Sequence, residues 1–118
     1  MTTVDERRQH RRHPVRTSVR CRRIGRGGFD EEVTSDDLSA GGMLLRADRR
    51  LGVGDVLVID IEAGGVALSM KGLVIATREI VGQPDQRYVH VAFTGLSADR
   101  LAGLARLLDS WERAESAN

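Results

Sequence analysis

The sequence predicts an all-β domain that ends in one helix, with the strands arranged as an antiparallel barrel or sandwich. At 118 residues the chain has the length of a single domain with one modest core. Short segments of alternating apolar and polar residues are separated by glycine-containing turns, which is typical of antiparallel sheets. Only the end of the chain, from residue 98 onward, changes to a helical spacing of apolar residues.

The first half of the chain contains an arm and three predicted strands. Residues 1–13 show no hydrophobic periodicity, so we expect a flexible basic arm followed by a folded domain over residues 14–118. After Pro14, apolar or small residues alternate with polar ones through Arg22, which is the period of a half-buried strand. The turn sequences GRGG and SAGG then separate two further strands, expected at Phe29–Thr34 and Met43–Arg46.

Three more strands are expected before the helix. The sequence LGVGD at 51–55 reads as a loop that leads into an apolar strand, Val56–Ile61, and the glycines of AGG at 63–65 indicate a hairpin turn. The following strand is long, from Val66 to about Glu79, and Gly72 in its middle suggests a bulge or bend. We expect GQPDQ at 82–86 to be a loop and Tyr88–Phe93 to be the last strand.

The C-terminal segment has the spacing of an amphipathic helix from Ala98 to about Ala114. Ser97 is placed to cap its N-terminus, and Asp99 lies in the first turn, where a carboxylate favours the helix dipole. One apolar face is expected to consist of Leu101, Leu104, Ala105, Leu108 and Trp111.

Charge is distributed unevenly along a chain whose formal net charge is only +1. Nine of the 18 basic residues lie between Arg7 and Arg26, and no acid occurs in that span. A local basic cluster on a nearly neutral protein favours a small anionic ligand over a long polyanion. The four aromatic residues are too few to supply a series of stacking platforms, so nucleic acid is not the expected partner. An acidic cluster follows the basic span and consists of Asp30, Glu31, Glu32, Asp36 and Asp37.

Several classes of protein are disfavoured by what the sequence lacks. The single cysteine, Cys21, cannot form an intramolecular disulfide and fits a reducing compartment, so a cytoplasmic location is expected, with no membrane insertion. The three histidines lack metal-ligand spacing, and no nucleophile–base pairing can be recognised. We therefore expect a protein with no metal, no cofactor and no catalytic residues, that is, one that is not an enzyme.

Two short sequences carry the functional chemistry. In RRQHRR at 7–12, the pairs Arg8/Arg12 and Arg7/Arg11 are each four residues apart, and each guanidinium offers a planar fork of donors to phosphate oxygens or to the O6 and N7 edge of guanine. In DLSAGG at 37–42, the acid can accept hydrogen bonds from a guanine edge, and the glycines permit close approach. Taken alone, the first sequence could be a solvated tail and the second an ordinary turn.

Together the two sequences resemble the signature of the PilZ family, bacterial receptors of cyclic di-GMP. The family pattern is RxxxR followed some 20 to 30 residues later by [D/N]xSxxG; Arg8 to Arg12 match the first half, and Asp37, Ser39 and Gly42 match the second. The register Arg8/Arg12 is preferred because it places the second arginine just before Pro14, where the first strand opens.

The resemblance implies a six-stranded antiparallel β-barrel of the split-barrel type with the C-terminal helix packed on it. It also implies that Arg8 and Arg12 grip phosphate and guanine, while Asp37, Ser39 and Gly42 contact guanine from the strand side. Further candidates for ligand contacts are Arg7, Arg11, Gly41 and His90. The last of these departs from the family, because many members have glycine where this chain has the histidine of HVAF.

The function implied is a receptor whose arm changes conformation on binding cyclic di-GMP and that signals to an unidentified effector protein. An alternative within the family is an adaptor in motility or pilus function with weak or no nucleotide binding. A third hypothesis, a nucleic-acid-binding arm, is disfavoured by the neutral charge and the scarcity of aromatic residues.

Overall fold

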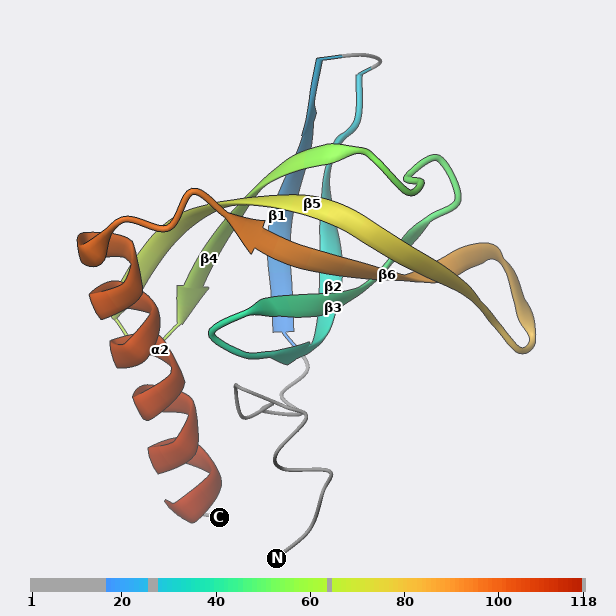
Figure 1. Ribbon diagram of the computed structural model, residues 1–118. Helices are drawn as coiled ribbons and strands as arrows, with labels where there is room; N and C mark the ends of the chain where they lie inside the picture. The colour runs from blue at the N-terminus through green and yellow to red at the C-terminus, as the bar shows by residue number, and fades with distance from the viewer. Residues whose placement is uncertain (1–16, 26–27, 64, 118) are drawn as a thin grey trace, which may run out of the picture.

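The six predicted strands form a closed antiparallel barrel, with one helix beside it, in a computed structural model that describes residues 17–25, 28–63 and 65–117 (Figure 1). Around the barrel the strands follow the order β1-β2-β3-β6-β5-β4. The predicted fold class is therefore confirmed. The elements are β1 (Thr17–Ile24), β2 (Asp30–Leu38), β3 (Gly42–Asp48), β4 (Val56–Ala63), β5 (Val66–Ile80), β6 (Gln83–Thr94) and α2 (Ala98–Ala117).

Aliphatic side chains fill the barrel because successive residues of each strand point alternately inward and outward. In β3, for example, Met43, Leu45 and Ala47 are buried, whereas the residues between them are partly exposed. Cys21 of β1 is also fully buried within this core. The scarcity of aromatic residues is thus met by a core of Leu, Ile, Val and Met side chains.

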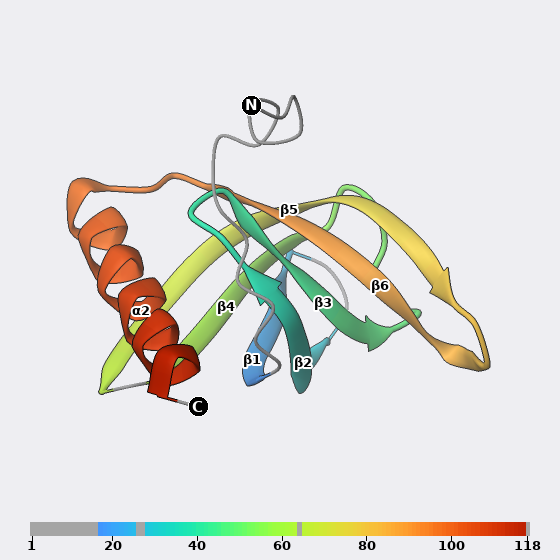
Figure 2. The ribbon, with the colours of Figure 1, turned by 90° about the horizontal axis from the view of Figure 1, so that it is seen from below.

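The hairpin that joins β5 and β6 is tighter than predicted. Residues 83–86, expected to be a loop, belong to β6, and the turn consists of Val81 and Gly82, the latter with a φ of 82° that favours glycine. The polar residues misled the prediction because this end of the hairpin is exposed and projects from the barrel on the side away from α2 (Figures 1 and 2). Similarly, β2 continues four residues beyond the predicted end, to Leu38.

Gly72 does not mark a bulge, contrary to the prediction. It is regularly paired with Leu57 and Phe93, and the irregularities of β5 lie between Val74 and Ala76 and between Glu79 and Ile80 instead. A Cβ atom at Gly72 would clash with the side chain of Val91, so glycine is required here by close packing rather than by a bend.

The helix α2 begins where predicted and ends later. The Ser97 hydroxyl accepts a hydrogen bond from the amide of Arg100 at 3.2 Å, which confirms the predicted N-cap. The helix runs to Ala117, three residues beyond the predicted end. It lies along β4 and β5 on one side of the barrel (Figures 1 and 2).

The face that α2 buries differs from the predicted one. Leu104 is buried as predicted and Leu108 is partly buried against the core, and Leu107 is buried although it was not predicted. Leu101 and Ala105, expected on the buried face, are exposed. The reason is Gly103, where a Cβ atom would clash with Leu68 of β5: the helix approaches the barrel most closely along this glycine and turns the neighbouring leucines inward. The side chain of Trp111 lies outside the described residues.

Candidate functional site

The turn between β2 and β3 contains most of the DLSAGG sequence and is closed by its own hydrogen bonds. The amide of Ser39 donates to the carbonyl of Gly42 at 2.9 Å, and the Ser39 hydroxyl accepts from the amide of Gly41 at 3.2 Å. The Ser39 side chain is buried. In the structure the serine therefore stabilises the turn. The sequence had suggested this role only under the alternative interpretation, in which DLSAGG is an ordinary turn.

Gly42 is required because β3 and β6 approach each other closely at this point. A Cβ atom at Gly42 would clash with the carbonyl oxygen of Val91 in the neighbouring strand, and backbone atoms cannot easily give way. Next to it, the amide of Phe93 donates to the carbonyl of Gly41 at 2.9 Å. Gly42 does not have a positive φ, so the lack of space, and not an unusual backbone conformation, excludes larger residues at this position.

A β-bulge at Asp36 places the acid of the motif on the outer face. The register shifts between Ser35, which pairs with Leu45, and Asp37, which pairs with Leu44. Without the extra residue, Asp37 would stand opposite the buried Met43 and point into the core. The bulge thus allows two consecutive aspartates to avoid the barrel interior.

The bulge is held by an ion pair that sequence reasoning missed. Arg46 Nη2 of β3 lies 2.9 Å from Asp36 Oδ2, and only 20% and 15% of the two side chains are exposed. The hydrogen bond to Asp36 raises the pKa of the Arg46 guanidinium, because it stabilises the charged form. In addition, the Ser35 hydroxyl donates to the carbonyl of Asp37 at 3.1 Å. The Arg46 guanidinium therefore holds the side chain of Asp36, and the Ser35 hydroxyl holds the backbone of Asp37.

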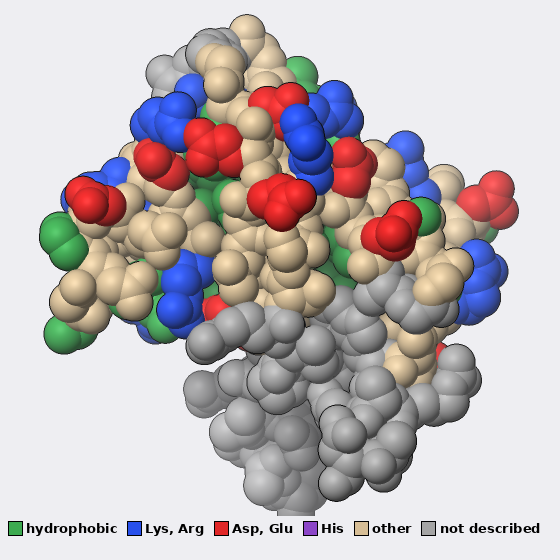
Figure 3. Space-filling model, turned by 180° about the vertical axis from the view of Figure 1, so that it is seen from behind, with side chains coloured by type: hydrophobic (Ala, Val, Ile, Leu, Met, Phe, Trp, Pro, Cys, Tyr) green, Lys and Arg blue, Asp and Glu red, His purple; other side chains and the backbone are tan. Residues whose placement is uncertain are grey.

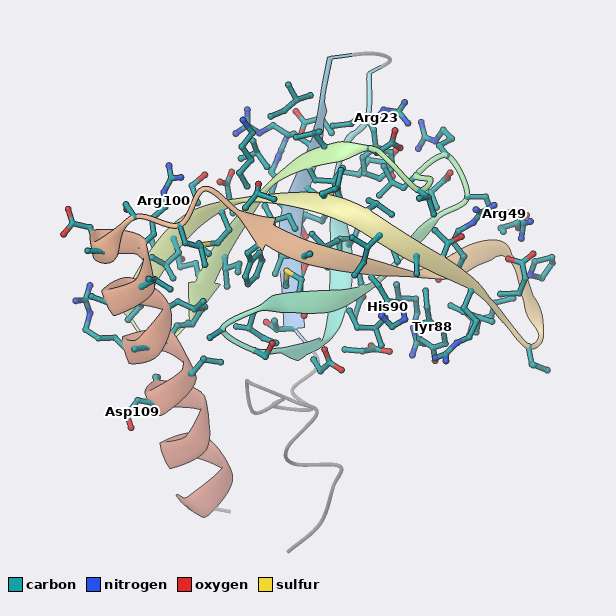
Figure 4. The ribbon with its side chains drawn as sticks, viewed as in Figure 1. Arg23, Arg49, Tyr88, His90, Arg100 and Asp109 are labelled. Carbon is teal, nitrogen blue, oxygen red and sulfur yellow. The ribbon has the colours of Figure 1, made fainter. Side chains whose placement is uncertain are left out.

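His90 lies in the same row of the outer face as Asp37. It pairs with Leu44 on one side and with Ala76 on the other, so that the row crosses β2, β3, β6 and β5. Two strand spacings, roughly 10 Å, separate the aspartate from the histidine. Tyr88, two residues away on the same strand, lies on the same side of the barrel (Figure 4). Strand alternation around His90 was the signal that could have identified this tyrosine.

Two arginines flank Tyr88. The guanidinium carbon of Arg46 lies 5.6 Å from the centre of the ring, and that of Arg78 lies 5.0 Å from it, both within the range of a cation–π interaction. Arg46 therefore connects the tyrosine to Asp36 and the bulge. The outer face next to the motif carries positive charge and one aromatic ring.

The arginines of the arm, Arg7, Arg8, Arg11 and Arg12, lie outside the described residues, so their predicted roles remain predictions. The structure does show where the arm joins the barrel. β1 begins at Thr17, which pairs with Ser35 of β2. The two residue steps from Ser35 to Asp37, together with one strand spacing, put Thr17 roughly 8 Å from Asp37.

The basic residues Arg20 and Arg22 of β1 are paired with acidic residues of β2 and β4. Arg20 lies 2.8 Å from Asp30 and Arg22 lies 3.9 Å from Asp60, so acidic and basic side chains are interleaved over the back of the barrel (Figure 3). The hydrogen bond between Arg20 and Asp30 raises the pKa of the arginine and lowers that of the aspartate. Arg20 and Arg22 of the basic cluster therefore already have acidic partners within the barrel.

The comparison with protein families identifies the fold and the motifs together. The PilZ domain family matches residues 6–110, which include both candidate sequences. The chain belongs to the PilZ family. The family resemblance noted from the sequence is thereby confirmed. No curated protein matches the sequence significantly.

Solved PilZ structures share the fold of this PilZ domain. The PilZ domain of YcgR from Escherichia coli, with c-di-GMP, is 20% identical with a TM-score of 0.73, and the match covers 92% of this chain and 94% of that one. The PilZ domain of CeSA from a cellulose-synthesizing bacterium is 20% identical with a TM-score of 0.66, and the match covers 86% of this chain and 98% of that one. MrkH in the MrkH–c-di-GMP complex from K. pneumonia is 20% identical with a TM-score of 0.70, and the match covers 94% of this chain but only 55% of MrkH.

The described part of this PilZ domain contains no grouped metal ligands, and its cysteine is buried. Among residues 17–25, 28–63 and 65–117, no three His, Cys, Asp or Glu side chains are grouped so that they could hold a metal ion. Burial raises the pKa of the Cys21 thiol to about 12, so this cysteine is a poor nucleophile. None of the helices described is long and apolar enough to cross a membrane.

Proposed function

We propose that this PilZ domain is a receptor for cyclic di-GMP and is not an enzyme. The observation that carries the proposal is the position of the second motif: the β2 bulge puts Asp37 on the outer face, within roughly 8 Å of Thr17, the first residue of the strand that follows the arginine-bearing arm. Solved structures of YcgR and MrkH with c-di-GMP provide the family precedent.

The length of the arm is sufficient to bring its arginines to this surface. Arg12 precedes Thr17 by five residues, and an extended chain of that length spans at most about 17 Å. That reach exceeds the separation between Thr17 and Asp37. The arm can therefore fold back over the row that runs from Asp37 to His90.

The chemistry of the two motifs matches that of the ligand. Cyclic di-GMP carries two phosphodiester charges and two guanines, and a guanidinium fork can bind either a phosphate or the O6 and N7 edge of guanine. Arg8 and Arg12 take this role. The carboxylate of Asp37 accepts from the N1–H and the amino group of guanine, while Ser39 and Gly42 keep the turn in shape. Arg7, Arg11, Gly41 and His90 are additional contacts.

The arm, residues 1–13, is the part that responds to the ligand. Four guanidinium groups within six positions repel one another in the free protein, and bound phosphates remove that repulsion. The ligand therefore orders the arm, and the ordered arm with its ligand forms the surface that an effector protein recognises. The buried, unpaired Cys21 is compatible with action in the cytoplasm.

Isothermal titration calorimetry of the full chain at physiological salt tests the proposal. Cyclic di-GMP should bind, whereas GTP and cyclic GMP, which each lack the second guanosine phosphate, should bind weakly or not at all. Single- and double-stranded oligonucleotides serve as controls for general charge. If an oligonucleotide bound as tightly as cyclic di-GMP, the receptor function would be wrong.

A further inference from the structure

Exposed apolar side chains form a continuous stripe over three strands of the barrel. Ile24 of β1 pairs with Val56 of β4, which in turn pairs with Leu73 of β5, so the three lie side by side on the outer face. Ile75, 55% exposed, and Val53, 66% exposed, extend this row. We call these five residues the apolar stripe. A contiguous exposed group of this kind on a small domain commonly marks an interaction site.

Backbone hydrogen bonds fix the end of the stripe that consists of Ile75 and Val53. The bulge of β5 falls between Val74 and Ala76 and leaves Ile75 outside the regular ladder. The amide of Gly54 donates to the carbonyl of Val74, and the amide of Val74 donates to the carbonyl of Asp55, each at 2.9 Å. These bonds fix the loop between β3 and β4 against the bulge, so that Val53 and Ile75 occupy neighbouring positions.

A recess with two cations adjoins the stripe. It has a volume of about 240 Å³, and Ile24 of the stripe forms part of its wall, together with Val58 and Met70. Lys71 and Arg100 lie at its polar side, the latter at the start of α2 (Figure 4). Unlike Arg20 and Arg22, these two cations have no ion-pair partner within the described part of the chain.

The stripe also adjoins the ligand surface. Leu73 pairs with Ala92 of β6, and Ala92 pairs with Gly42 of the DLSAGG turn, so two strand spacings, roughly 10 Å, separate the stripe from the turn. A ligand held between Gly42 and His90 would lie beside the apolar stripe. One partner could therefore contact both.

We propose that the apolar stripe and its recess dock an amphipathic helix of a partner protein, with acidic residues flanking the apolar face of that helix. The apolar face covers Leu73 and Ile75, and a carboxylate enters the recess between Lys71 and Arg100. A helix fits better than a strand, because the six strands close into a barrel and leave no free edge to which a strand could add. The regulation of this docking by cyclic di-GMP rests on the proposed receptor function; the docking itself does not.

Three fluorescent peptides of about 14 residues, each about four helical turns, provide the test with the full-length chain. The first has leucines on one helical face and glutamates elsewhere, the second has lysines in place of the glutamates, and the third has serines in place of the leucines. Measured by fluorescence anisotropy, the first should bind at least about tenfold more tightly than the other two. Cyclic di-GMP should increase its affinity further.

Matched variants locate the binding surface. Ile75→Asp and Lys71→Glu should each weaken the binding of the acidic amphipathic peptide by about tenfold or more. Lys71→Glu should also strengthen the binding of the lysine peptide. Val81→Asp is the control, because Val81 is 99% exposed at the β5–β6 turn, outside the stripe, and the change there should have no effect. Thermal melting of each variant verifies that it is folded.

The contrary results are equally distinct. Equal affinity for the three peptides, undetectable binding of the acidic one, or an equal loss with Val81→Asp would overturn the docking proposal. So would a stripe variant whose only effect is on self-association in sedimentation, since the occupant would then be a second copy of the chain. Calorimetry with cyclic di-GMP on the same samples separates the two proposals: peptide selectivity without nucleotide binding would refute the receptor function alone.

Discussion

Two β-bulges of the barrel, one at Asp36 of β2 and one at Ile75 of β5, have different surroundings. The bulge of β2 directs Asp37 outward and is held by side chains, namely the Arg46–Asp36 ion pair and the Ser35 hydroxyl. The bulge of β5 lies beside Ile75, which strand alternation already turns outward together with Leu73, and it is held by backbone hydrogen bonds from the loop before β4. The first therefore depends on particular polar residues, whereas the second depends mainly on the backbone.

The difference separates a polar surface for a small ligand from an apolar surface for a protein partner on one small barrel. A small anion with guanine bases needs a fixed carboxylate and mobile guanidinium groups, whereas a protein partner needs apolar area. Regular strand alternation would place either kind of side chain at every second position only. The β2 bulge departs from that pattern at Asp37 and the β5 bulge at Ala76, and β3 and β6 lie between the two points.

The largest expected effect comes from the arm that completes the polar site. Arg12→Ala should weaken the binding of cyclic di-GMP by about 30-fold or more, since loss of one partner of a buried charged contact costs about 2–5 kcal/mol. Arg12→Lys should be nearly as damaging because an ammonium cannot reproduce the bidentate fork. The control is Arg20→Ala, an exposed residue already paired with Asp30. An equal loss in the control, measured by calorimetry, would indicate general charge rather than a site.

A substitution at Gly42 tests how rigidly the polar bulge and its turn are supported. Gly42→Val forces β3 away from the Val91 carbonyl, and overpacking of this kind costs about 1–3 kcal/mol of stability. We expect a lower midpoint of thermal unfolding together with weaker ligand binding. Gly52→Ala is the matched control, because a Cβ atom there meets open space. Similar destabilisation by both changes would contradict the close approach seen at Gly42.

The ion pair at the β2 bulge should have a moderate effect on ligand binding through Asp37. Arg46→Gln or Asp36→Asn removes the charged contact, and we expect affinity to fall by about three- to tenfold, an interaction of about 1 kcal/mol. The exchanged pair, Asp36→Arg with Arg46→Asp, should recover part of that loss. Calorimetry on the wild type, Asp36→Arg, Arg46→Asp and the exchanged pair gives the coupling energy; no recovery would mean that Arg46 acts on the ligand directly and not as a positioning residue.

The smallest effect on nucleotide binding is expected from the apolar bulge. Ile75→Asp changes an exposed side chain that no ligand contact requires, so affinity for cyclic di-GMP should stay within about twofold of the wild-type value and stability within about 0.5 kcal/mol. Calorimetry and thermal melting check both values. A large loss of nucleotide affinity would show that the two bulges are not independent, and the comparison between them would fail.

The sequence was sufficient for the architecture because strand alternation and glycine turns are local signals. It predicted all six strands, the N-cap at Ser97 and the second motif, and it misplaced features that depend on contacts between strands. Gly72 looked like a bulge but is small because Val91 packs on it, and Leu107 was missed because Gly103 sets the rotation of α2. Neither contact can be read from one segment alone.

The site was only partly predictable for the same reason. Asp37, Ser39 and Gly42 were identified as a motif, but two aspartates in succession gave no indication that both avoid the barrel interior. That depends on the register with β3 and on Arg46, ten residues away from Asp36. Tyr88 acquires its place beside the site through pairing between β3 and β6.

Amide hydrogen exchange with and without cyclic di-GMP tests the central claim most directly, namely that the ligand orders the arm over a preformed site on the barrel. Residues 7–12 should exchange rapidly in the free protein and become protected when the ligand is added. The amides of Ser39 and Phe93, which are hydrogen-bonded in the turn and to it, should be protected in both states. Strong protection of residues 7–12 without ligand, or no change on its addition, would contradict the account.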